Sequence, residues 1–303
     1  MYHICVPATT ANLGPGFDSL GLALKIHNHF YIKEIDKGLK FSAVERDTGK
    51  PVKLGMENNL VFSVMKRVFK RFNRPLDGIE LREEIEIPLA RGLGSSATAV
   101  IAGILSANYI LDNPLTDDEM IEIAIDIEGH PDNVVAAFKG GFIINVPADK
   151  GTEYKKVEIS VDLKAVVVIP DFELKTDELR NLLPETVSYQ DAIYNHSRTA
   201  LLVASLYQRD YHQLAMAMQD RLHQDYRAKL IPGFYKVLEA AYKNGAYGVA
   251  LSGAGPSIIA LTSSKTVEIA EAMVNTFSEH GVESKYLVSI PENRGSFIEK
   301  TSI

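Results

Sequence analysis

Residues 88–98 read Pro88-Leu89-Ala90-Arg91-Gly92-Leu93-Gly94-Ser95-Ser96-Ala97-Thr98, and they stand between a segment of alternating charged and apolar residues and the most apolar segment of the chain. Glycine adopts backbone angles that are closed to other residues, so Gly92 and Gly94 allow peptide N–H groups to converge on an anion. A helix that begins at Ser95 adds unpaired N–H donors and a partial positive charge. The segment therefore predicts a phosphate-binding loop; the alternative is a tight strand-to-helix turn with serine caps.

The spacing of this loop distinguishes it from two common nucleotide motifs. A Walker A loop requires Gly-Lys-Ser/Thr at a fixed distance, and no such sequence follows here. A dinucleotide fingerprint requires a residue pattern GxGxxG, but the third residue after Gly94 is Ala97, so that interpretation is weak.

Composition limits the kinds of partner that the chain can have. It has 303 residues, a length that suits two domains or one large one, and 46% of them are hydrophobic. Lys and Arg sum to 32 against 39 Asp and Glu, which gives a formal net charge of −7. A general nucleic-acid binder would show a basic field, so an anionic ligand here must be held by local backbone amides and a few placed cations.

Cysteine content and hydropathy indicate a cytoplasmic protein. Cys5 is the single cysteine, so no intramolecular disulfide can form, and no Cys and His residues have zinc spacing. The first residues lack the features of a signal peptide, and no run approaches the roughly 18 apolar residues of a membrane span.

Periodicity predicts a mixed α+β protein with a seam near residue 150. Alternation predicts strands at 2–6, 21–35, 78–87, 142–146 and 165–169, and three- and four-residue spacing predicts helices at 58–71, 95–111, 188–206 and 211–227. Thr116 and Glu119 form a capping box before a helix that reaches Ile127. Helices at 234–243 and 265–279 alternate with strands at 247–251, 257–261 and 282–288.

Two further glycine segments give the loop a family context: Leu13-Gly14-Pro15-Gly16-Phe17-Asp18 and Ser252-Gly253-Ala254-Gly255-Pro256-Ser257. The three blocks, in this order, resemble those of the GHMP small-molecule kinases, and the match extends over most of the chain. The resemblance implies a two-domain fold. Residues 1–150 would form a ribosomal protein S5-like nucleotide-binding domain with a left-handed βαβ unit, and residues 151–303 a ferredoxin-like domain.

Two other segments are similar to those of the homoserine kinases within this family: Glu128-Gly129-His130-Pro131-Asp132-Asn133, and Tyr226-Arg227 followed by residues 230–234. The resemblance implies ATP with Mg²⁺ as phosphoryl donor. It places the nucleotide on residues 88–98 and on Asn58 and Asn59. Mg²⁺ prefers hard oxygen ligands and few protein groups, so a hydroxyl from Ser95 or Ser96, with Glu128 opposite, would suit it.

L-Homoserine carries a carboxylate, an ammonium and a primary hydroxyl. The resemblance implies that Asp18 pairs with the ammonium and that Arg180 and Arg227 hold the carboxylate. Asn12 and Thr176 would also contact the substrate, and Arg198 is the alternative to Arg180. A guanidinium suits a carboxylate because two parallel charge-assisted hydrogen bonds fix position and orientation.

The resemblance also implies a catalytic group of His130, Asp132 and Asn133. Phosphoryl transfer has a loose transition state, so early deprotonation of the acceptor is not required. We therefore assign Asp132 to orientation, with a role as base as a hypothesis.

Two other functions compete with this interpretation. A GHMP kinase for mevalonate-type alcohols would leave Asp18 without an ammonium, and a non-catalytic sensor of ATP or a metabolite could use the same scaffold. A homodimer is an expectation of the resemblance alone.

Overall fold

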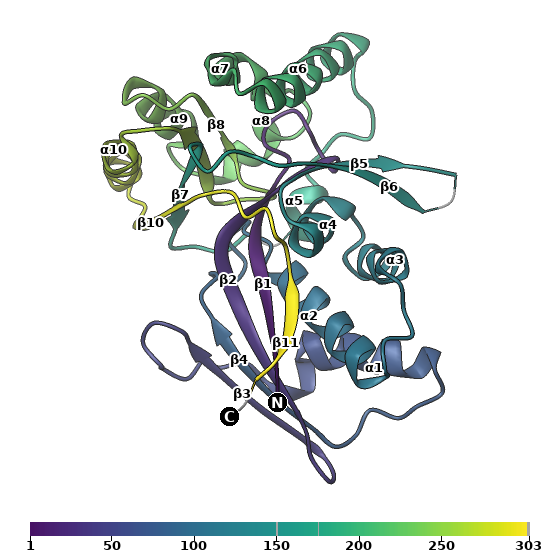
Figure 1. Cartoon of the computed structure of the whole chain (residues 1–303). Coiled ribbons are helices and arrows are strands. Elements are labelled where there is room, and N and C mark those ends of the chain that lie inside the picture. Colours follow the sequence, from purple (N-terminus) through teal and green to yellow (C-terminus); the bar gives the residue numbers. More distant parts are fainter. Residues whose placement is uncertain (150, 175, 302–303) are drawn as a thin grey trace.

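Two β-sheets organise the chain, and Figure 1 shows them one above the other. The computed structural model describes residues 1–149, 151–174 and 176–301. Within these ranges, no helix combines the length and the apolar character needed to cross a membrane.

The first sheet has the strand order β11-β1-β2-β4-β3, with β5 pairing β2 and β6 pairing β5. Its strands are β1 (Tyr2–Ala11), β2 (Leu20–Glu34), β3 (Leu39–Glu45), β4 (Ile79–Ile85), β5 (Phe142–Pro147), β6 (Thr152–Val157) and β11 (Phe297–Lys300). Alternate residues of β2, such as Ile26 and Phe30, are buried, as the period of two in a strand requires. Strands β3 and β4 pair in parallel, and the other described strand pairs of this sheet are antiparallel.

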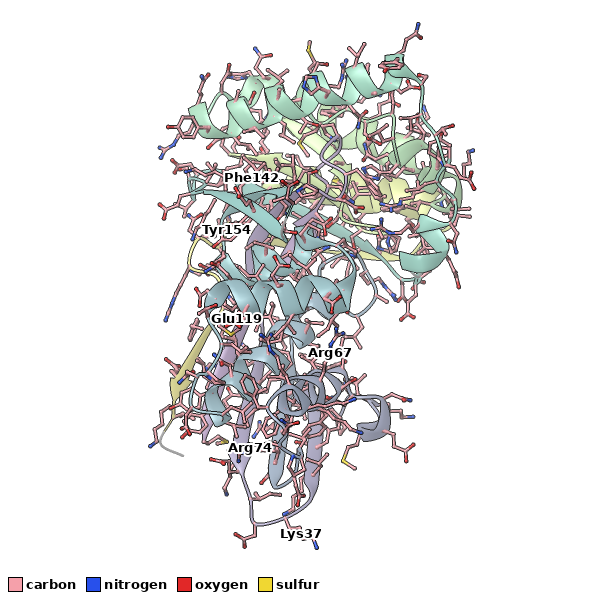
Figure 2. All side chains as sticks on the ribbon, turned by 90° about the vertical axis from the view of Figure 1, so that its right-hand side faces the viewer. Lys37, Arg67, Arg74, Glu119, Phe142 and Tyr154 are labelled. Carbon is pink, nitrogen blue, oxygen red and sulfur yellow. The ribbon has the colours of Figure 1, made fainter. Side chains whose placement is uncertain are left out.

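One face of this sheet is covered by α1 (Leu60–Arg71), α2 (Ser95–Ile110), α3 (Asp117–Glu128) and α4 (Pro131–Lys139), with the short η1 (Met56–Asn58) before α1. The predicted capping box is confirmed, because Thr116 and Glu119 exchange side-chain-to-backbone hydrogen bonds. Figure 2 shows Arg67 of α1 and Glu119 of α3 in the same helical layer. Helix α2 is apolar on nearly all sides because it lies in the middle of this layer.

The second sheet has the strand order β10-β7-β9-β8 and is antiparallel throughout. It contains β7 (Lys164–Pro170), β8 (Gly248–Leu251), β9 (Ile258–Thr262) and β10 (Ser284–Ser289). Helices α9 (Phe234–Lys243) and α10 (Thr266–Glu279) bury one of its faces. Helices α6 (Tyr189–Gln208) and α7 (Leu214–Ala217) bury the other, together with residues of β2 from the first sheet.

The prediction of one continuous helix over residues 211–227 is wrong. The structure has η2 (Tyr211–Gln213), α7, an irregular turn, α8 (Gln224–Arg227) and η3 (Ala228–Leu230). The side chain of Asp220 interrupts the helix, since its carboxylate accepts hydrogen bonds from the backbone N–H groups of Leu222, His223 and Gln224. Strands β3, β6 and β11, and the short helices α4 and α5 (Thr176–Arg180), were not predicted.

Strands from both sides of the predicted seam share the first sheet. Strand β6 follows residue 150 and pairs with β5, and β11, near the chain end, pairs with β1. Figure 1 shows the yellow β11 beside the purple β1. The division at residues 150 and 151 and the left-handed βαβ unit stay predictions.

Candidate active site

The described residues enclose a cavity of about 620 Å³, and all three glycine segments contribute to its wall. From the predicted site it gathers Asn12, Asp18, Asn58, Asn59, Leu89, Ala90, Arg91, Gly92, Gly94, Ser95, Ser96, Thr98, Glu128, His130, Asp132, Asn133, Arg180 and Arg227. Residues that are far apart in sequence therefore meet at one place.

The phosphate-binding loop ends at an uncapped helix. Gly94 occupies the N-cap position of α2 in the left-handed conformation, with φ 68°, and no side chain caps the first turn. The first N–H groups of α2 are therefore available to an anion, and the helix dipole adds a partial positive charge. This geometry favours the predicted cradle over a serine-capped turn.

Close contacts join the phosphate-binding loop, the end of β1 that leads into the first glycine segment, and residues 252–257. The N–H of Thr9 donates to the carbonyl of Leu93 at 3.1 Å, and the N–H of Gly253 donates to that of Ala11 at 3.1 Å. The hydroxyl of Ser252 donates to the carbonyl of Gly92 at 2.7 Å. A Cβ on Gly92 would lie 2.2 Å from the carbonyl oxygen of Ser252, so only glycine permits this approach.

Ser96 and Glu128 form a pair of hard oxygen ligands beside the loop. The Ser96 hydroxyl donates to Glu128 Oε2 at 3.0 Å, and both residues line the cavity. Burial raises the pKa of Glu128, while the charge of His130 and the Ser96 hydrogen bond act in the opposite direction. A hydroxyl and a carboxylate facing a phosphate cradle fit Mg²⁺, which keeps phosphate and water as its other ligands. The structure favours Ser96 over Ser95, since Ser96 is the serine that contacts Glu128.

His130, Asp132 and Asn133 form one hydrogen-bonded group. Asp132 is 2% exposed, and its Oδ1 lies 2.6 Å from His130 Nδ1 and accepts the backbone N–H of Asn133 at 2.8 Å. Burial favours the neutral imidazole, but the hydrogen bond to Asp132 and its charge outweigh this effect and raise the pKa of His130. Asn133 Oδ1 in turn accepts the hydroxyl of Thr9 at 2.7 Å.

Asp18 and Arg180 form a bidentate ion pair on the cavity wall. The two guanidinium nitrogens of Arg180 donate to the two carboxylate oxygens of Asp18 at 2.8 and 2.9 Å. Asp18 belongs to the first glycine segment and Arg180 ends α5, so this pair joins two distant parts of the chain.

Arg227 is a buried cation without an acidic neighbour at ion-pair distance among the described residues. It is 1% exposed, and its Nη1 donates to the carbonyl of Gly253 at 3.2 Å. Burial lowers the pKa of Arg227 to about 10, and the nearby charge of Arg180 adds to this effect. A buried guanidinium whose nearest contacts are neutral is suited to an anionic ligand.

The end of the cavity near α1 has apolar walls and one buried acid. Phe30, Leu60 and Ile85 line it, together with Glu83. Glu83 is 5% exposed, and its Oε1 accepts the side-chain amide of Asn59 at 2.8 Å, while Asn59 Oδ1 caps α1. Burial raises the pKa of Glu83, and the Asn59 hydrogen bond lowers it. The sequence had indicated Asn59 but not Glu83, which belongs to no motif.

Some predicted residues lie elsewhere. Leu93 and Ala97 are buried beneath the loop, and Pro88 lines a separate surface cavity behind it. Arg198 stacks on Tyr194 of α6, 3.2 Å from the ring centre, and is not part of the cavity wall. Thr176 begins α5, and its side chain lies outside the described part of the structure.

The cavity wall also contains residues that were not predicted to be in the site. Asn28, Lys53, Leu174 and residues 253–255 are among them. Arg91 pairs with Glu173 at 3.2 Å and with Asp171 at 3.7 Å, so the loop after β7 contacts the phosphate-binding loop.

Comparisons with known proteins agree with this geometry. Residues 59–141 match the model of the GHMP kinases N terminal domain, and residues 202–280 match that of the GHMP kinases C terminal region. The homoserine kinase of Halothermothrix orenii is 48% identical, over 99% of this chain and 96% of its own length. That of Persephonella marina is 43% identical, over 97% of each chain.

Solved structures show the same fold. A crystal structure of homoserine kinase from Cytophaga hutchinsonii has a TM-score of 0.85 and 31% identity, and it covers 98% of this chain and 96% of its own. A mevalonate kinase from L. major has a TM-score of 0.70 with 18% identity, covers 95% of each chain, and shares the fold alone. The chain therefore belongs to the GHMP kinases, in their homoserine kinase branch.

Proposed function

We propose that this chain transfers the γ-phosphoryl group of ATP to the side-chain hydroxyl of L-homoserine, giving O-phospho-L-homoserine for threonine biosynthesis. The proposal also includes a cytoplasmic enzyme that forms a homodimer and that binds small molecules but neither nucleic acid nor membranes.

The charges beside the phosphate-binding loop carry this proposal. Arg180, Arg227 and Asp18 line the same cavity as the uncapped start of α2. Two cations and one anion complement a substrate with a carboxylate and an ammonium. We expect the substrate carboxylate to bind Arg227 and Arg180, and its ammonium to bind Asp18, so that the substrate replaces the internal ion pair with two new ones.

The proposed binding mode of ATP, the phosphoryl donor, follows from the geometry of the phosphate-binding loop. We place the triphosphate on the backbone N–H groups of residues 92–98 and the adenine at the apolar end, near Asn58 and Asn59. Ser96 and Glu128 would hold Mg²⁺, which supplies charge neutralisation on the phosphates when bound. The net charge of −7 is no obstacle, because main-chain dipoles supply the local positive potential.

Asn12, His130, Asp132 and Asn133 orient the acceptor hydroxyl in this proposal. Asp132 Oδ1 already contacts His130 and the backbone N–H of Asn133, so Oδ2 is the oxygen that would face the hydroxyl. Positioning and charge neutralisation supply most of the acceleration in phosphoryl transfer. Loss of turnover by many orders of magnitude in Asp132→Asn, with unchanged substrate affinity, would instead support a base.

A coupled ADP-release assay with homoserine, mevalonate, shikimate and galactose tests the proposal. We expect turnover with homoserine and little with the others, because mevalonate has no ammonium for Asp18. Turnover confined to another alcohol would overturn the substrate assignment and leave a GHMP kinase. ATP binding without turnover on any member of the panel would indicate a sensor.

A further inference from the structure

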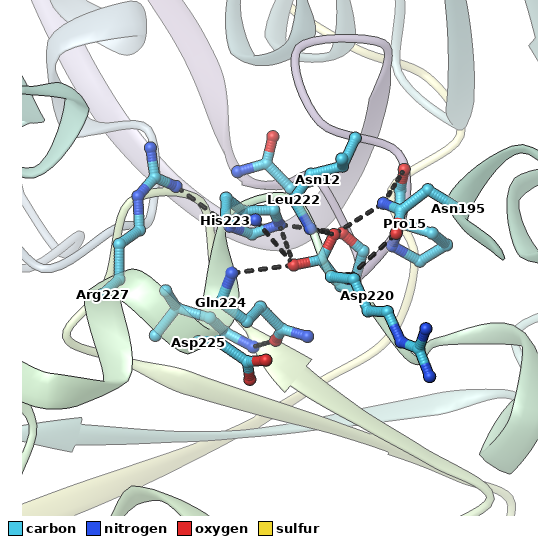
Figure 3. A network of polar contacts seen from close by, with 12 residues as sticks. Asn12, Pro15, Asn195, Asp220, Leu222, His223, Gln224, Asp225 and Arg227 are labelled. Atoms are coloured by element: carbon cyan, nitrogen blue, oxygen red, sulfur yellow. Dashed lines mark hydrogen bonds and ion pairs between the residues drawn. The ribbon is translucent and has the colours of Figure 1, made fainter. Parts of the chain in front are cut away.

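Outside the predicted site, the buried imidazole of His223 contacts both Arg227 and the first glycine segment. It is 0% exposed and lies on the turn between α7 and α8. Its Nε2 lies 2.8 Å from the carbonyl oxygen of Gly14, and its Nδ1 lies 3.2 Å from Nη1 of Arg227. Figure 3 shows the ring between Asn12 and Arg227.

These two contacts determine the tautomer of the ring. A carbonyl can only accept a hydrogen bond, so Nε2 carries the proton. A guanidinium can only donate, so Nδ1 must be unprotonated. Burial lowers the pKa of His223, and the charge of Arg227 acts in the same direction, while Asp220 opposes both. The imidazole is therefore neutral and presents an acceptor to Arg227.

The ring itself is held by a rigid frame. Asp220 Oδ2 accepts the backbone N–H groups of His223 and Gln224, at 2.9 and 2.7 Å. Asp220 Oδ1 accepts the side-chain amide of Asn195 at 2.6 Å, and that amide also contacts the carbonyl of Pro15 at 3.3 Å. Figure 3 shows this network between Pro15 and Arg227. His223 therefore cannot move without displacing the first glycine segment.

We propose that His223 is a positioning residue that holds the guanidinium of Arg227 toward the substrate carboxylate and fixes it relative to the first glycine segment. The inference rests on the proposed function. His223 Nδ1 and the carbonyl of Gly253 both engage Nη1, which leaves Nη2 available to the carboxylate. Through Gly14, the same ring ties Arg227 to the first glycine segment, which follows Asn12 and ends at Asp18.

Two amide substitutions separate the two contacts of the ring. The shorter side chain in His223→Asn places an oxygen near the position of Nδ1, so it keeps an acceptor for Arg227 and loses the bond to Gly14. The longer side chain in His223→Gln reaches the position of Nε2, so it keeps the donor to Gly14 and loses the acceptor. His212→Gln, at an exposed histidine of η2, is the matched control.

Steady-state kinetics give the readout. For His223→Gln we expect the KM for homoserine to rise about tenfold or more, with kcat and the KM for ATP within about twofold. For His223→Asn we expect a smaller rise in the same KM, and for the control none. Adding His223→Gln to Arg227→Ala should cause no further rise, since the histidine acts through the arginine. Equal effects of Asn and Gln, a fall in kcat alone, or additive effects in the double variant would overturn the proposal.

A measurement on the unaltered protein covers the case in which a variant does not fold. Nitrogen-15 NMR of the imidazole should show the neutral Nε2–H tautomer near neutral pH, and its Nδ1 signal should shift when homoserine is added to the protein with a non-hydrolysable ATP analogue. A charged ring, the other tautomer or an unmoved signal would overturn the proposal. Failure of the proposed function is distinguishable, because it would appear as absent turnover of homoserine by the unaltered protein.

Discussion

Gly94 is a position in the phosphate-binding loop with no room for a side chain. A Cβ at this position would lie 2.0 Å from Thr9 Oγ1 and 3.3 Å from Asn133 Oδ1, and φ is +68°. The same hydroxyl donates to Asn133, so a side chain at position 94 would disturb both the loop and the hydrogen-bonded group of His130, Asp132 and Asn133.

We therefore expect Gly94→Ala to weaken ATP binding by tenfold or more, about 1.4 kcal/mol, as measured by isothermal titration calorimetry. Gly281→Ala is the matched control, because Gly281 also has a positive φ, +74°, but nothing lies within 4 Å of its would-be Cβ. Backbone strain of roughly 1 kcal/mol is common to both variants, so their difference isolates the clash. Equal ATP affinity in the two variants would contradict the assigned role of Gly94.

At the scale of elements, the outer face of the first sheet carries His29, whose ring resists protonation. His29 of β2 lies beside His3 of β1, with 2.8 Å between His3 Nε2 and His29 Nδ1. Burial lowers the pKa of His29 to about 3, and the charges of Arg46, His3 and His27 act in the same direction. Strand pairing therefore favours a neutral ring here.

This depressed pKa predicts acid sensitivity. Below about pH 6.5, the ordinary value for histidine, the unfolded chain binds a proton that the folded chain excludes. The free energy of unfolding should fall as the pH drops from about 6.5 toward 3, by at most about 1.4 kcal/mol per pH unit for this proton. Urea denaturation at several pH values measures the slope, which should be smaller in His29→Gln and unchanged in His280→Gln, at an exposed histidine. An identical slope in all three proteins would rule out His29 as the cause.

Sequence patterns predicted those helices whose start and buried face depend on residues close together in the chain. The apolar stripe of α1 and the capping box of α3 were both confirmed, because each depends on residues within one or two turns. The pairing of β11 with β1 could not be predicted, since it depends on a contact made only after the chain has folded. The break at Asp220 depends on bonds to backbone N–H groups two to four residues on, a local signal that the helical spacing of residues 211–227 concealed.

In the candidate site, too, the sequence indicated the residues that belong to motifs, and only the structure shows the others. Glycine and serine in residues 92–96 indicated the loop, and the structure places most of the predicted residues around one cavity. Glu83 and His223 belong to no motif, and only burial and geometry distinguish them from other acids and histidines. Family resemblance placed Asp18 opposite an ammonium, but only the structure shows that Arg180 already occupies its carboxylate.

At the scale of the whole molecule, one hydrophobic cluster joins the two sheets. It includes Leu22 of β2 and Phe142 of β5 from the first sheet, and Val167 of β7 and Leu202 of α6 from the second half. Figure 2 shows Phe142 at the level where the two halves meet. Residues of both halves line the cavity, so its geometry depends on both halves being folded.

A shared core predicts that the chain unfolds in a single transition. Leu22 is 0% exposed, so Leu22→Ala should lower the free energy of unfolding by about 2 to 5 kcal/mol. Calorimetry should show one transition, with the van't Hoff enthalpy equal to the calorimetric enthalpy, in the original protein and in the variant. Leu182→Ala, at a leucine that is 42% exposed, should have little effect. Two separate transitions would show that the halves unfold independently.

The pairing of β11 with β1 also constrains how the protein can be made. The register joins Tyr2 to Lys300, so β1 receives this neighbour only after all the residues between the two strands have been translated. Until then one side of β1 is an unpaired sheet edge, which is a template for association with other chains. The growing polypeptide is therefore exposed to misassembly while the residues between β1 and β11 are translated, and the docking of β11 removes that hazard.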